Sequence, residues 1–497
     1  MKTENILANR IKLKPLELSK TRSVGDIVNA MNYCAAGAGM LGAAAITLEE
    51  WTQSPRKPLI IHDGGRSALR NLLQKMVREG MCERVLTSDE FVSLRSRSKD
   101  RPAVIVGTWT ERNSEGIFKR AEEAIYVNPY GLSPPGRWND GHYPNVVFSD
   151  ERFIMPTLYR ALDEWGNGRR WTATEFTGWL RQFGGMAAET AKGAEVSYEM
   201  FTDPECDTIF MSIAGIMTVA QLGPLIRDMI DCGLANFVAS TGALMGHGLI
   251  QASGLAHYRH DPRLGDEVLL EHGINRVSTA HEDETNFDHI EEIVGAVLQE
   301  LTERKRPIAP SAFHREIGRY VKVHYPQYLG ILRSAFEQKV PICVPAFTDS
   351  ELFNDIDTFN RRQRLRGKPP VRFDPELDNH HLVEAAVRSR KMGIFTIGGG
   401  PPRNWLQNVC PLLHLINRRK AGKVKIRRYS YGVRIDSTPP WFMNLSGARY
   451  TECVAWGKFY PDAKIAEIMG CATLPWPFIL KSVLERMKRP RKSRIWN

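Results

Sequence analysis

The sequence predicts an α/β protein: a Rossmann-like parallel sheet flanked by helices, with an additional α/β region in the N-terminal part of the chain. Short apolar segments alternate with amphipathic helical segments, which is the pattern of layered α/β folds. Several apolar segments end in turns rich in glycine or hydroxyl side chains. The chain has 497 residues, of which 42% are hydrophobic and 25% charged, as expected for a globular protein of two or three domains.

The C-terminal half supplies most of the predicted elements. The expected strands are short apolar runs that lead into polar or glycine-rich turns: 207–213, 236–239, 342–346 and 393–397. Two helices are expected, at 219–231, which Gly233 ends, and at 287–303, whose apolar residues recur at helical spacing. Strands and helices in this alternation predict parallel strands joined by crossover helices.

The chain divides into regions by composition. We expect a helical arm at 1–57, a diverged α/β region at 58–205, the main α/β core at 206–484 and a basic tail at 485–497. The tail holds six basic side chains and no acid in the last twelve residues, out of a net charge of +11. We interpret it as a disordered, solubilising tail; weak binding to RNA or another acidic partner is the alternative. No aromatic-rich motif supports nucleic-acid binding.

Two segments of the N-terminal half parallel segments of the core. Residues 76–88 and 229–241 both combine a helix end, a glycine, a strand and a hydroxyl-rich turn. Residues 171–176 and 308–313 both follow an amphipathic helix. We suspect that 58–200 is a partial copy of the first half of the core, and general similarity between α/β segments is the alternative.

The cysteines and the N-terminus indicate a cytoplasmic protein. Eight cysteines are spread singly, with no C-x-x-C pair and none beside His257 or His260, which favours reduced thiols and argues against a zinc or other metal site. Residues 1–10 are polar and charged, unlike a signal peptide. The uncharged segments 34–48 and 234–256 are too short or too polar for a membrane span, so we expect no membrane association.

One block carries the strongest functional signal. The segment Asn444-Leu-Ser-Gly-Ala-Arg-Tyr-Thr-Glu-Cys-Val-Ala-Trp-Gly-Lys458 resembles the signature of deoxyhypusine synthases and their bacterial homologues. Four further blocks resemble the same family, in the same order, over roughly 270 residues: 237–242, 271–276, 345–349 and 398–404. The ordered set is far more specific than any single block.

The resemblance implies a chemistry. Members of this family oxidise spermidine with NAD, move its butyl-imine fragment onto an enzyme lysine, and pass it to a second amine. Lys458 matches that lysine, and its apolar neighbours suit a buried amine with a lowered pKa. Glu452 and Trp456 are four residues apart and could face a polyamine cation together, and Asn404 follows the glycine turn.

The expected cofactor residues lie mostly in turns that follow strands. NAD is the implied cofactor, and the candidate residues are Ser240, Thr241, Gly242, Asp349, Gly398, Gly399, Gly400, Ser446, Gly447 and Thr473. Glycines after a strand let a backbone approach a phosphate or ribose closely. We identify no G-x-G-x-x-G fingerprint, which argues against a standard Rossmann dehydrogenase.

Three positions depart from the eukaryotic pattern. Leu445 replaces an acid, Asn404 replaces a histidine, and Cys471 replaces a further acid. The first two resemble the bacterial branch, whose pattern suits free-amine acceptors such as putrescine or spermidine, giving homospermidine-type products. A catalytically inactive paralogue with an assembly or regulatory role is the alternative, and an NAD-dependent dehydrogenase is a third that would leave Lys458 unexplained. The resemblance also implies a homotetramer.

Overall fold

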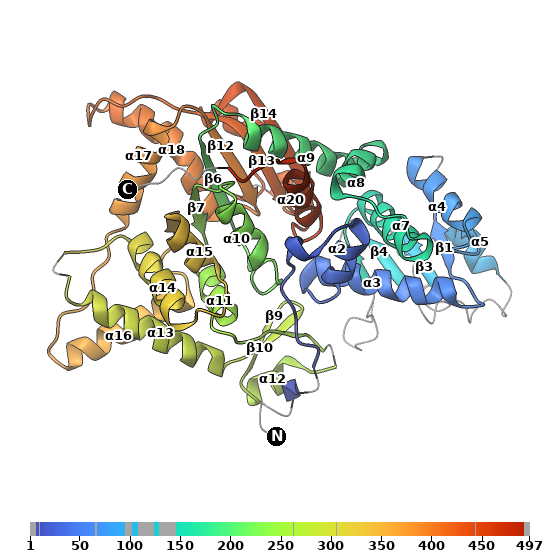
Figure 1. Cartoon of the computed structure of the whole chain (residues 1–497), viewed down its shortest axis with the longest axis horizontal. Helices are drawn as coiled ribbons and strands as arrows, with labels where there is room; N and C mark the ends of the chain where they lie inside the picture. Colours follow the sequence, from blue (N-terminus) through green and yellow to red (C-terminus); the bar gives the residue numbers. More distant parts are fainter. Residues whose placement is uncertain are drawn as a thin grey trace.

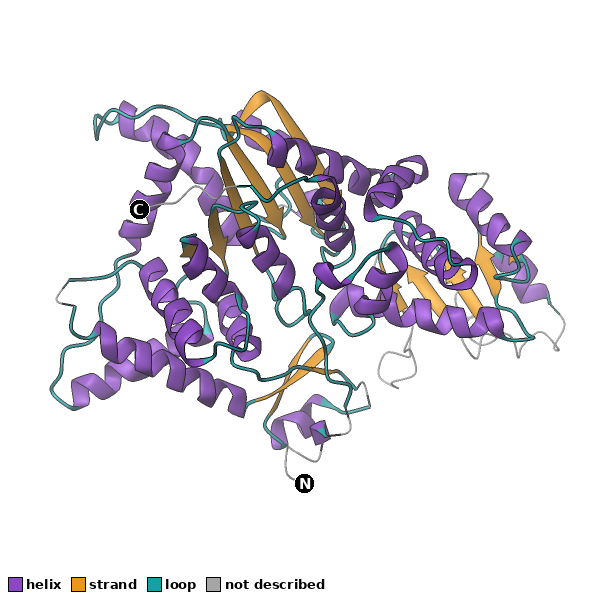
Figure 2. Cartoon of the chain, in the orientation of Figure 1, coloured by secondary structure: helices purple, strands orange, loops and turns teal. Residues whose placement is uncertain are grey.

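The computed structural model describes residues 6–8, 10–64, 67–94, 102–107, 124–128, 146–261, 263–304, 306–442 and 444–491. Lys492 and Arg494 of the basic tail lie outside the described residues. Two parallel sheets, each covered by helices, lie on opposite sides of the molecule in Figure 1, and a small antiparallel sheet lies below the larger one. Figure 2 shows the helices surrounding both sheets, so the predicted α/β class is confirmed.

The larger sheet has six parallel strands in the order β11-β7-β6-β12-β13-β14. Their bounds are β6 (Thr208–Ile213), β7 (Phe237–Ser240), β11 (Ile342–Cys343), β12 (Met392–Ile397), β13 (Tyr429–Asp436) and β14 (Phe459–Met469). The four predicted strands are all present, although the segment predicted at 342–346 is extended over only two residues. Strands β6 and β12 are buried along their whole length, because helices cover both faces of a parallel sheet.

Helices connect these strands. They are α10 (Gly223–Asp231), α11 (Gly242–Ala252), α12 (Asp266–Glu271), α13 (Thr285–Leu301), α14 (Pro310–His324), α15 (Ile331–Gln338), α16 (Glu351–Leu365), α17 (Pro375–Arg388), α18 (Gly400–Arg418), α19 (Tyr450–Ala455) and α20 (Pro475–Arg486). Helix α10 is shorter than predicted, because residues 217–222 form turns in which Gln221 has a φ of 69°. Helix α13 matches its prediction to within two residues at each end.

The small antiparallel sheet has the order β8-β10-β9, with bounds β8 (Tyr258–Arg259), β9 (Ile274–Val277) and β10 (Ala280–Asp283). It lies between α11 and the N-terminal segment of the chain. Backbone hydrogen bonds from Leu13 to the His257 carbonyl and from Arg259 to the Ile11 carbonyl attach that segment to it.

The N-terminal half contains the second sheet, with five parallel strands in the order β2-β1-β3-β4-β5. The strands are β1 (Leu59–His62), β2 (Val85–Leu86), β3 (Ala103–Val106), β4 (Ala124–Asn128) and β5 (Val146–Phe148). The helices of this half are α2 (Val24–Met31), α3 (Ala36–Gln53), α4 (Ala68–Arg78), α5 (Ser88–Ser93), α7 (Glu151–Asn167), α8 (Ala173–Leu180) and α9 (Gly185–Thr202).

Within the described part of the chain, no single helix is long and apolar enough to cross a membrane; α2 and α3 meet those criteria only as a pair bent by 110°.

The two sheets share one strand order. Reading β1 as β6, β2 as β7 and β3 to β5 as β12 to β14 makes the five-stranded order identical to the larger sheet without β11. The helix ends at Gly80 and Gly233 also match, since each glycine has a positive φ and the residue after it bonds back to a methionine carbonyl, Met76 or Met229. The predicted similarity of 76–88 and 229–241 is therefore seen as helix, turn and strand.

The second predicted parallel, between 171–176 and 308–313, is wrong. The first segment leads into α8, which packs on α9 and α20, whereas the second leads into α14, which packs on α15. Helix α14 lies in the long segment between β7 and β12. The corresponding strands β2 and β3 of the smaller sheet are joined by a much shorter segment, from Leu86 to Ala103. We propose that an internal duplication covers the five-stranded sheet as a whole, beyond the first half of the core.

Helix α9 lies before residue 206 but packs on β13, β14 and α20 of the larger sheet. We therefore propose to draw the limit of the core ahead of α8 rather than at residue 206.

Phe153 of α7 is fully buried and its ring lies 6.1 Å from the ring of Phe478 in α20, so it joins the two halves. We predict that Phe153→Ala lowers the free energy of unfolding by about 3–5 kcal/mol, since a large buried side chain leaves a cavity. Urea unfolding followed by tryptophan fluorescence measures this. The control is Leu365→Ala, because Leu365 is 88% exposed; its effect should stay within about 0.5 kcal/mol. Equal effects of the two substitutions would contradict the prediction.

Candidate active site

Lys458 lies directly before β14, in the turn that follows α19. Gly457 gives this turn a φ of 66°, and the Lys458 backbone donates to the Cys453 carbonyl at 3.0 Å and accepts from the Tyr429 N–H at 2.9 Å. The side chain is only 8% exposed. Its Nζ donates to Asn404 Oδ1 at 3.2 Å, so the structure brings together two of the predicted catalytic residues.

The surroundings of Lys458 lower the pKa of its amine. Burial is the largest cause, and the nearby positive charge of Arg403 acts in the same direction, against the opposite influence of Cys453 and Glu452. Burial lowers the pKa because removing the ammonium from water disfavours the charged form. A lysine with a lowered pKa is neutral, and therefore nucleophilic, in a larger fraction of molecules at a given pH.

Glu452 and Trp456 lie close to Lys458 but are exposed. Glu452 is in the first turn of α19, and Trp456 caps the end of that helix with 66% of its surface exposed. The Trp456 ring centroid lies 6.0 Å from Lys458 Nζ, at the outer limit of a cation–π contact. These two side chains are open to a cationic ligand that approaches the amine from solvent.

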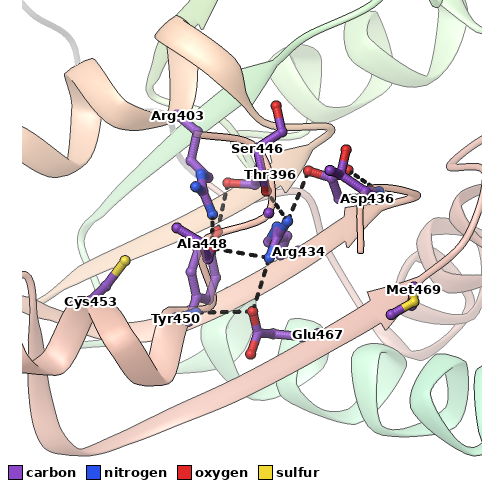
Figure 3. Close-up of polar contacts among 12 residues, drawn as sticks. Thr396, Arg403, Arg434, Asp436, Ser446, Ala448, Tyr450, Cys453, Glu467 and Met469 are labelled. Atoms are coloured by element: carbon purple, nitrogen blue, oxygen red, sulfur yellow. Dashed lines mark hydrogen bonds and ion pairs between the residues drawn. The ribbon is translucent and has the colours of Figure 1, made fainter. Parts of the chain in front are cut away.

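The loop 445–448 is held by two buried arginines (Figure 3). Arg403 of α18 donates to the carbonyls of Leu445 and, at 2.5 Å, Ala448. Arg434 of β13 donates to the carbonyls of Ser446 and, at 3.2 Å, Ala448. Ser446 and Gly447, predicted as cofactor residues, therefore lie in a loop whose backbone is fixed by charged hydrogen bonds.

Arg434 is itself paired with two acids, one on each side. Its guanidinium lies 2.9 Å from Asp436 Oδ2 and 3.2 Å from Glu467 Oε1, and Glu467 also accepts from the Tyr450 N–H at 2.9 Å. Although burial lowers the pKa of Arg434, its hydrogen bond and ion pair with Asp436 raise it overall. The sequence analysis missed this network; the available signal was an arginine and an aspartate two positions apart, Arg434 and Asp436, at the end of a mainly apolar segment.

The glycine turns lie at the carboxyl edge of the larger sheet. A Cβ on Gly399 would lie 2.6 Å from Ser446 Cα, and one on Gly242 would lie 2.1 Å from Ser350 Cβ. Gly400 has a φ of 63° and open space where a Cβ would be. The edge thus brings 398–400 beside 446–447, and 240–242 beside Asp349 and Ser350. Open parallel sheets bind nucleotides at this edge.

Thr473 is separated from this arrangement. It is 1% exposed, and its hydroxyl accepts from the Ala38 N–H of α3 at 3.0 Å and lies 3.1 Å from Cys471 Sγ. A Cβ on Gly37 would lie 3.1 Å from the same hydroxyl. The start of α3 thus covers Thr473 in this structure, and a role of Thr473 in cofactor binding stays a prediction.

The start of α3 also contains a G-x-G-x-x-G spacing, Gly37 to Gly42, which the sequence analysis did not identify. A dinucleotide fingerprint directly follows a strand, but no strand lies before this segment among the described residues 10–35. Its glycines serve close packing: a Cβ on Gly39 would lie 2.3 Å from the Cys34 carbonyl oxygen, and one on Gly42 would lie 2.2 Å from the Asn32 nitrogen.

The lowered pKa of Lys458 can be tested by competitive labelling with an amine-acylating reagent across a pH series. We predict that Lys458 becomes reactive at a lower pH than an ordinary lysine, whose pKa is about 10.4. The exposed Lys20 provides the reference in the same digest. Arg403→Met should shift the Lys458 profile back to higher pH, because it removes a neighbouring positive charge. A Lys458 profile that coincides with that of Lys20 would contradict the prediction.

Comparisons with known proteins identify the family of the chain. The family profile of deoxyhypusine synthase matches residues 176–483. A "Probable deoxyhypusine synthase" of Methanosarcina thermophila is 27% identical over 314 residues, which cover 62% of this chain and 91% of that protein. "Probable deoxyhypusine synthase 2" of Archaeoglobus fulgidus is 28% identical over 313 residues, covering 63% and 98%.

Among solved structures, one assigned as a deoxyhypusine synthase from Entamoeba histolytica aligns with a TM-score of 0.43 and 13% identity, covering 66% of this chain and 96% of that chain. Both sequence relatives are archaeal, and the placement in a bacterial branch stays a prediction. The family profile alone spans more than half of the 497 residues, and the chain therefore belongs to the deoxyhypusine synthase family.

Proposed function

We propose that this protein is a transferase that moves the 4-aminobutyl group of spermidine to an acceptor amine through an imine on Lys458. The observation that supports this most directly is the buried Lys458, whose pKa is lowered and whose Nζ is held by Asn404. A buried lysine on a helix-to-strand turn, beside a fixed amide oxygen, is arranged for nucleophilic attack.

In the proposed reaction, the neutral Lys458 amine attacks the imine carbon of oxidised spermidine. A carbon–nitrogen bond forms to Nζ and the bond to the diaminopropane part breaks, which releases that amine. The acceptor amine then attacks the same carbon and displaces Lys458. Asn404 Oδ1 orients Nζ by accepting a hydrogen bond from it. NAD, when bound, would accept the hydride from spermidine and return it to the final imine.

The residues of the carboxyl edge partly fit NAD. Gly400 has open space beside it, and its helix α18 has Gly399 as N-cap and therefore no side-chain cap, which leaves room for a phosphate or ribose. Ser240, Thr241 and Gly242, with Asp349, would hold the other part of the cofactor. The exception is Thr473, which α3 covers in this structure.

The exposed side chains around Lys458 suit a polyamine and a partner subunit. Glu452 supplies a carboxylate and Trp456 an aromatic face for an ammonium group. Further large apolar side chains are exposed in the same part of the sequence: Trp441, Phe442, Leu445 and Tyr460. We propose that they contact another copy in a homo-oligomer, a tetramer by family resemblance. All eight cysteines are free, which supports a reducing, cytoplasmic location.

A non-catalytic paralogue is the second candidate. The burial of Thr473 under α3 favours it, together with Leu445 and Cys471 in place of acids. The preserved pairing of Lys458 with Asn404 opposes it.

The first test traps the intermediate. With spermidine and NAD, borohydride should reduce a Lys458 imine to a stable adduct that peptide mass spectrometry locates. Lys458→Arg should reduce both the adduct and the transfer below detection, because a guanidinium does not form this imine. The matched control is Lys464→Arg, an exposed lysine of β14 that should keep full activity. Full transfer by the Lys458→Arg protein would remove Lys458 from the mechanism.

The second test identifies the acceptor. We predict that label from spermidine appears in a homospermidine-type free polyamine when putrescine or spermidine is present, since Leu445 and Asn404 depart from the pattern of protein-modifying relatives. Mass spectrometry of reactions with and without putrescine, and with the hypusine-bearing translation factor, measures this. Label found only on a lysine of that factor would refute the prediction. No label anywhere, with no adduct on Lys458, would favour the non-catalytic paralogue.

A further inference from the structure

Three side chains away from Lys458 form a buried group with metal-ligand chemistry. His247 of α11, His257 before β8 and Glu282 of β10 place their ligand atoms within 4.8 Å of one another. The side chains of His257 and Glu282 are 0% and 1% exposed, and that of His247 is nearly as buried. The Phe287 ring packs edge-on against His247.

The contacting atoms of the group lie slightly closer together than the ligands of a bound zinc ion. His247 Nδ1 lies 3.0 Å from Glu282 Oε2, and His257 Nε2 lies 3.1 Å from the same oxygen. Donors bound tetrahedrally at about 2.0–2.2 Å from a zinc ion lie about 3.3–3.5 Å apart. A shift of a few tenths of an ångström would therefore admit an ion between them.

Hydrogen bonding alone leaves the group unsatisfied. Glu282 Oε2 accepts from His247, but the contact with His257 lacks hydrogen-bonding geometry, and neither ring nitrogen of His257 has a hydrogen-bond partner among the described residues. Glu282 Oε1 is likewise buried without a partner in the described part of the chain. Orphaned buried polar atoms cost about 1–3 kcal/mol each, so native proteins rarely keep several together.

The composition of the group also favours a cation. Glu282 brings a carboxylate into the interior, where its side chain is only 1% exposed. A buried carboxylate needs a matching positive charge, and a divalent ion would supply it. The two imidazoles and the carboxylate of Glu282 provide three ligands, and a water molecule would complete the four that zinc prefers.

A second histidine pair shows the contrast. His260 Nδ1 and His281 Nε2 lie 2.7 Å apart on the other side of β10, where they bond to each other. Burial, together with His260, lowers the pKa of His281 to about 4, so it is neutral at pH 7. No acid completes this pair into a ligand group among the described residues, and it serves as an internal control.

We propose that His247, His257 and Glu282 bind one structural divalent ion of the zinc type. The sequence analysis expected no metal because no cysteine pair accompanies His257, yet the fold supplies the missing ligands from α11 and β10. The ion would fasten α11 to the small sheet. Because α11 begins at the 240–242 turn, the same ion would fix that turn at the carboxyl edge. The proposal does not depend on aminobutyl transfer.

The test uses the full-length protein without a histidine tag. Gel filtration in metal-free buffer followed by elemental analysis should find one zinc per chain. Removal by a chelator should lower the Tm, and added Zn²⁺ should restore it. Co²⁺ added to the stripped protein should give the visible absorption of a four-coordinate site, and Zn²⁺ should abolish that absorption.

Variants distinguish zinc bound at this site from zinc bound elsewhere, for example by the free cysteines. Glu282→Gln and His247→Gln should each lose the bound zinc and the Tm response to Zn²⁺, while His260→Gln should keep both. If either ligand variant fails to fold, stripping and reloading the wild-type protein still decides the question. Wild-type protein that purifies without a metal and shows no change in Tm on addition of Zn²⁺, Co²⁺, Ni²⁺ or Mn²⁺ would overturn the proposal. Equal zinc binding by the Glu282→Gln protein would also overturn it.

Discussion

The buried charge of Arg434 organises the catalytic half of the molecule. A guanidinium in the middle of a parallel sheet is tolerated only if its donors are paired, and Asp436, Glu467 and two loop carbonyls pair them. Each partner comes from a different place: the same strand, the next strand, and the loop that leads to Lys458. The position of the 445–448 loop therefore follows from one electrostatic requirement. The start of α19, whose Tyr450 N–H donates to Glu467, is fixed in the same way.

This arrangement separates rigid and open parts of the site. Lys458 and Asn404 are held on the sheet and on α18, with the amine mostly buried. Glu452 and Trp456 stand at the surface, where a long cation or another subunit can reach them. A polyamine would require both a buried and an exposed part of the site. One end must reach the buried reactive amine, while the other end keeps its charges close to water or to acids. The structure provides such a gradient within a few residues of α19.

The apolar strands were predictable from the sequence, whereas the polar ones were not. The strands that became β6 and β12 are mainly apolar runs without a charged residue, and both were located to within one residue. Strands β13 and β14 were not predicted, because Arg434, Lys464 and Glu467 interrupt their apolar pattern. Their charges are satisfied by tertiary partners that the sequence does not display. Residues 219–222 show the opposite error, since apolar spacing suggested a helix where a turn with a positive φ occurs.

The candidate site divides in the same manner. Lys458 and Asn404 were found through family blocks, and the structure joins them. Thr473 was selected on the same grounds, yet a helix from the other end of the chain covers it. His247, His257 and Glu282 stood in separate segments, 35 positions apart at the extremes, without a recognisable spacing. Only the folding of α11 over the small sheet brings them together.

The bond from Ala38 to Thr473 joins residues 435 positions apart. On the ribosome, the N-terminal segment is complete long before the final strand and α20 exist. Lys481 of α20 also donates to the carbonyls of Leu18 and Thr21, so these contacts of the N-terminal segment form only after the last helix is made. Contacts between residues so far apart in the sequence slow folding and leave apolar surface exposed to other molecules in the meantime. The nascent chain therefore stays incompletely folded until synthesis ends. Chaperones that bind it during synthesis would matter more for this protein than for one that folds progressively from its N-terminus.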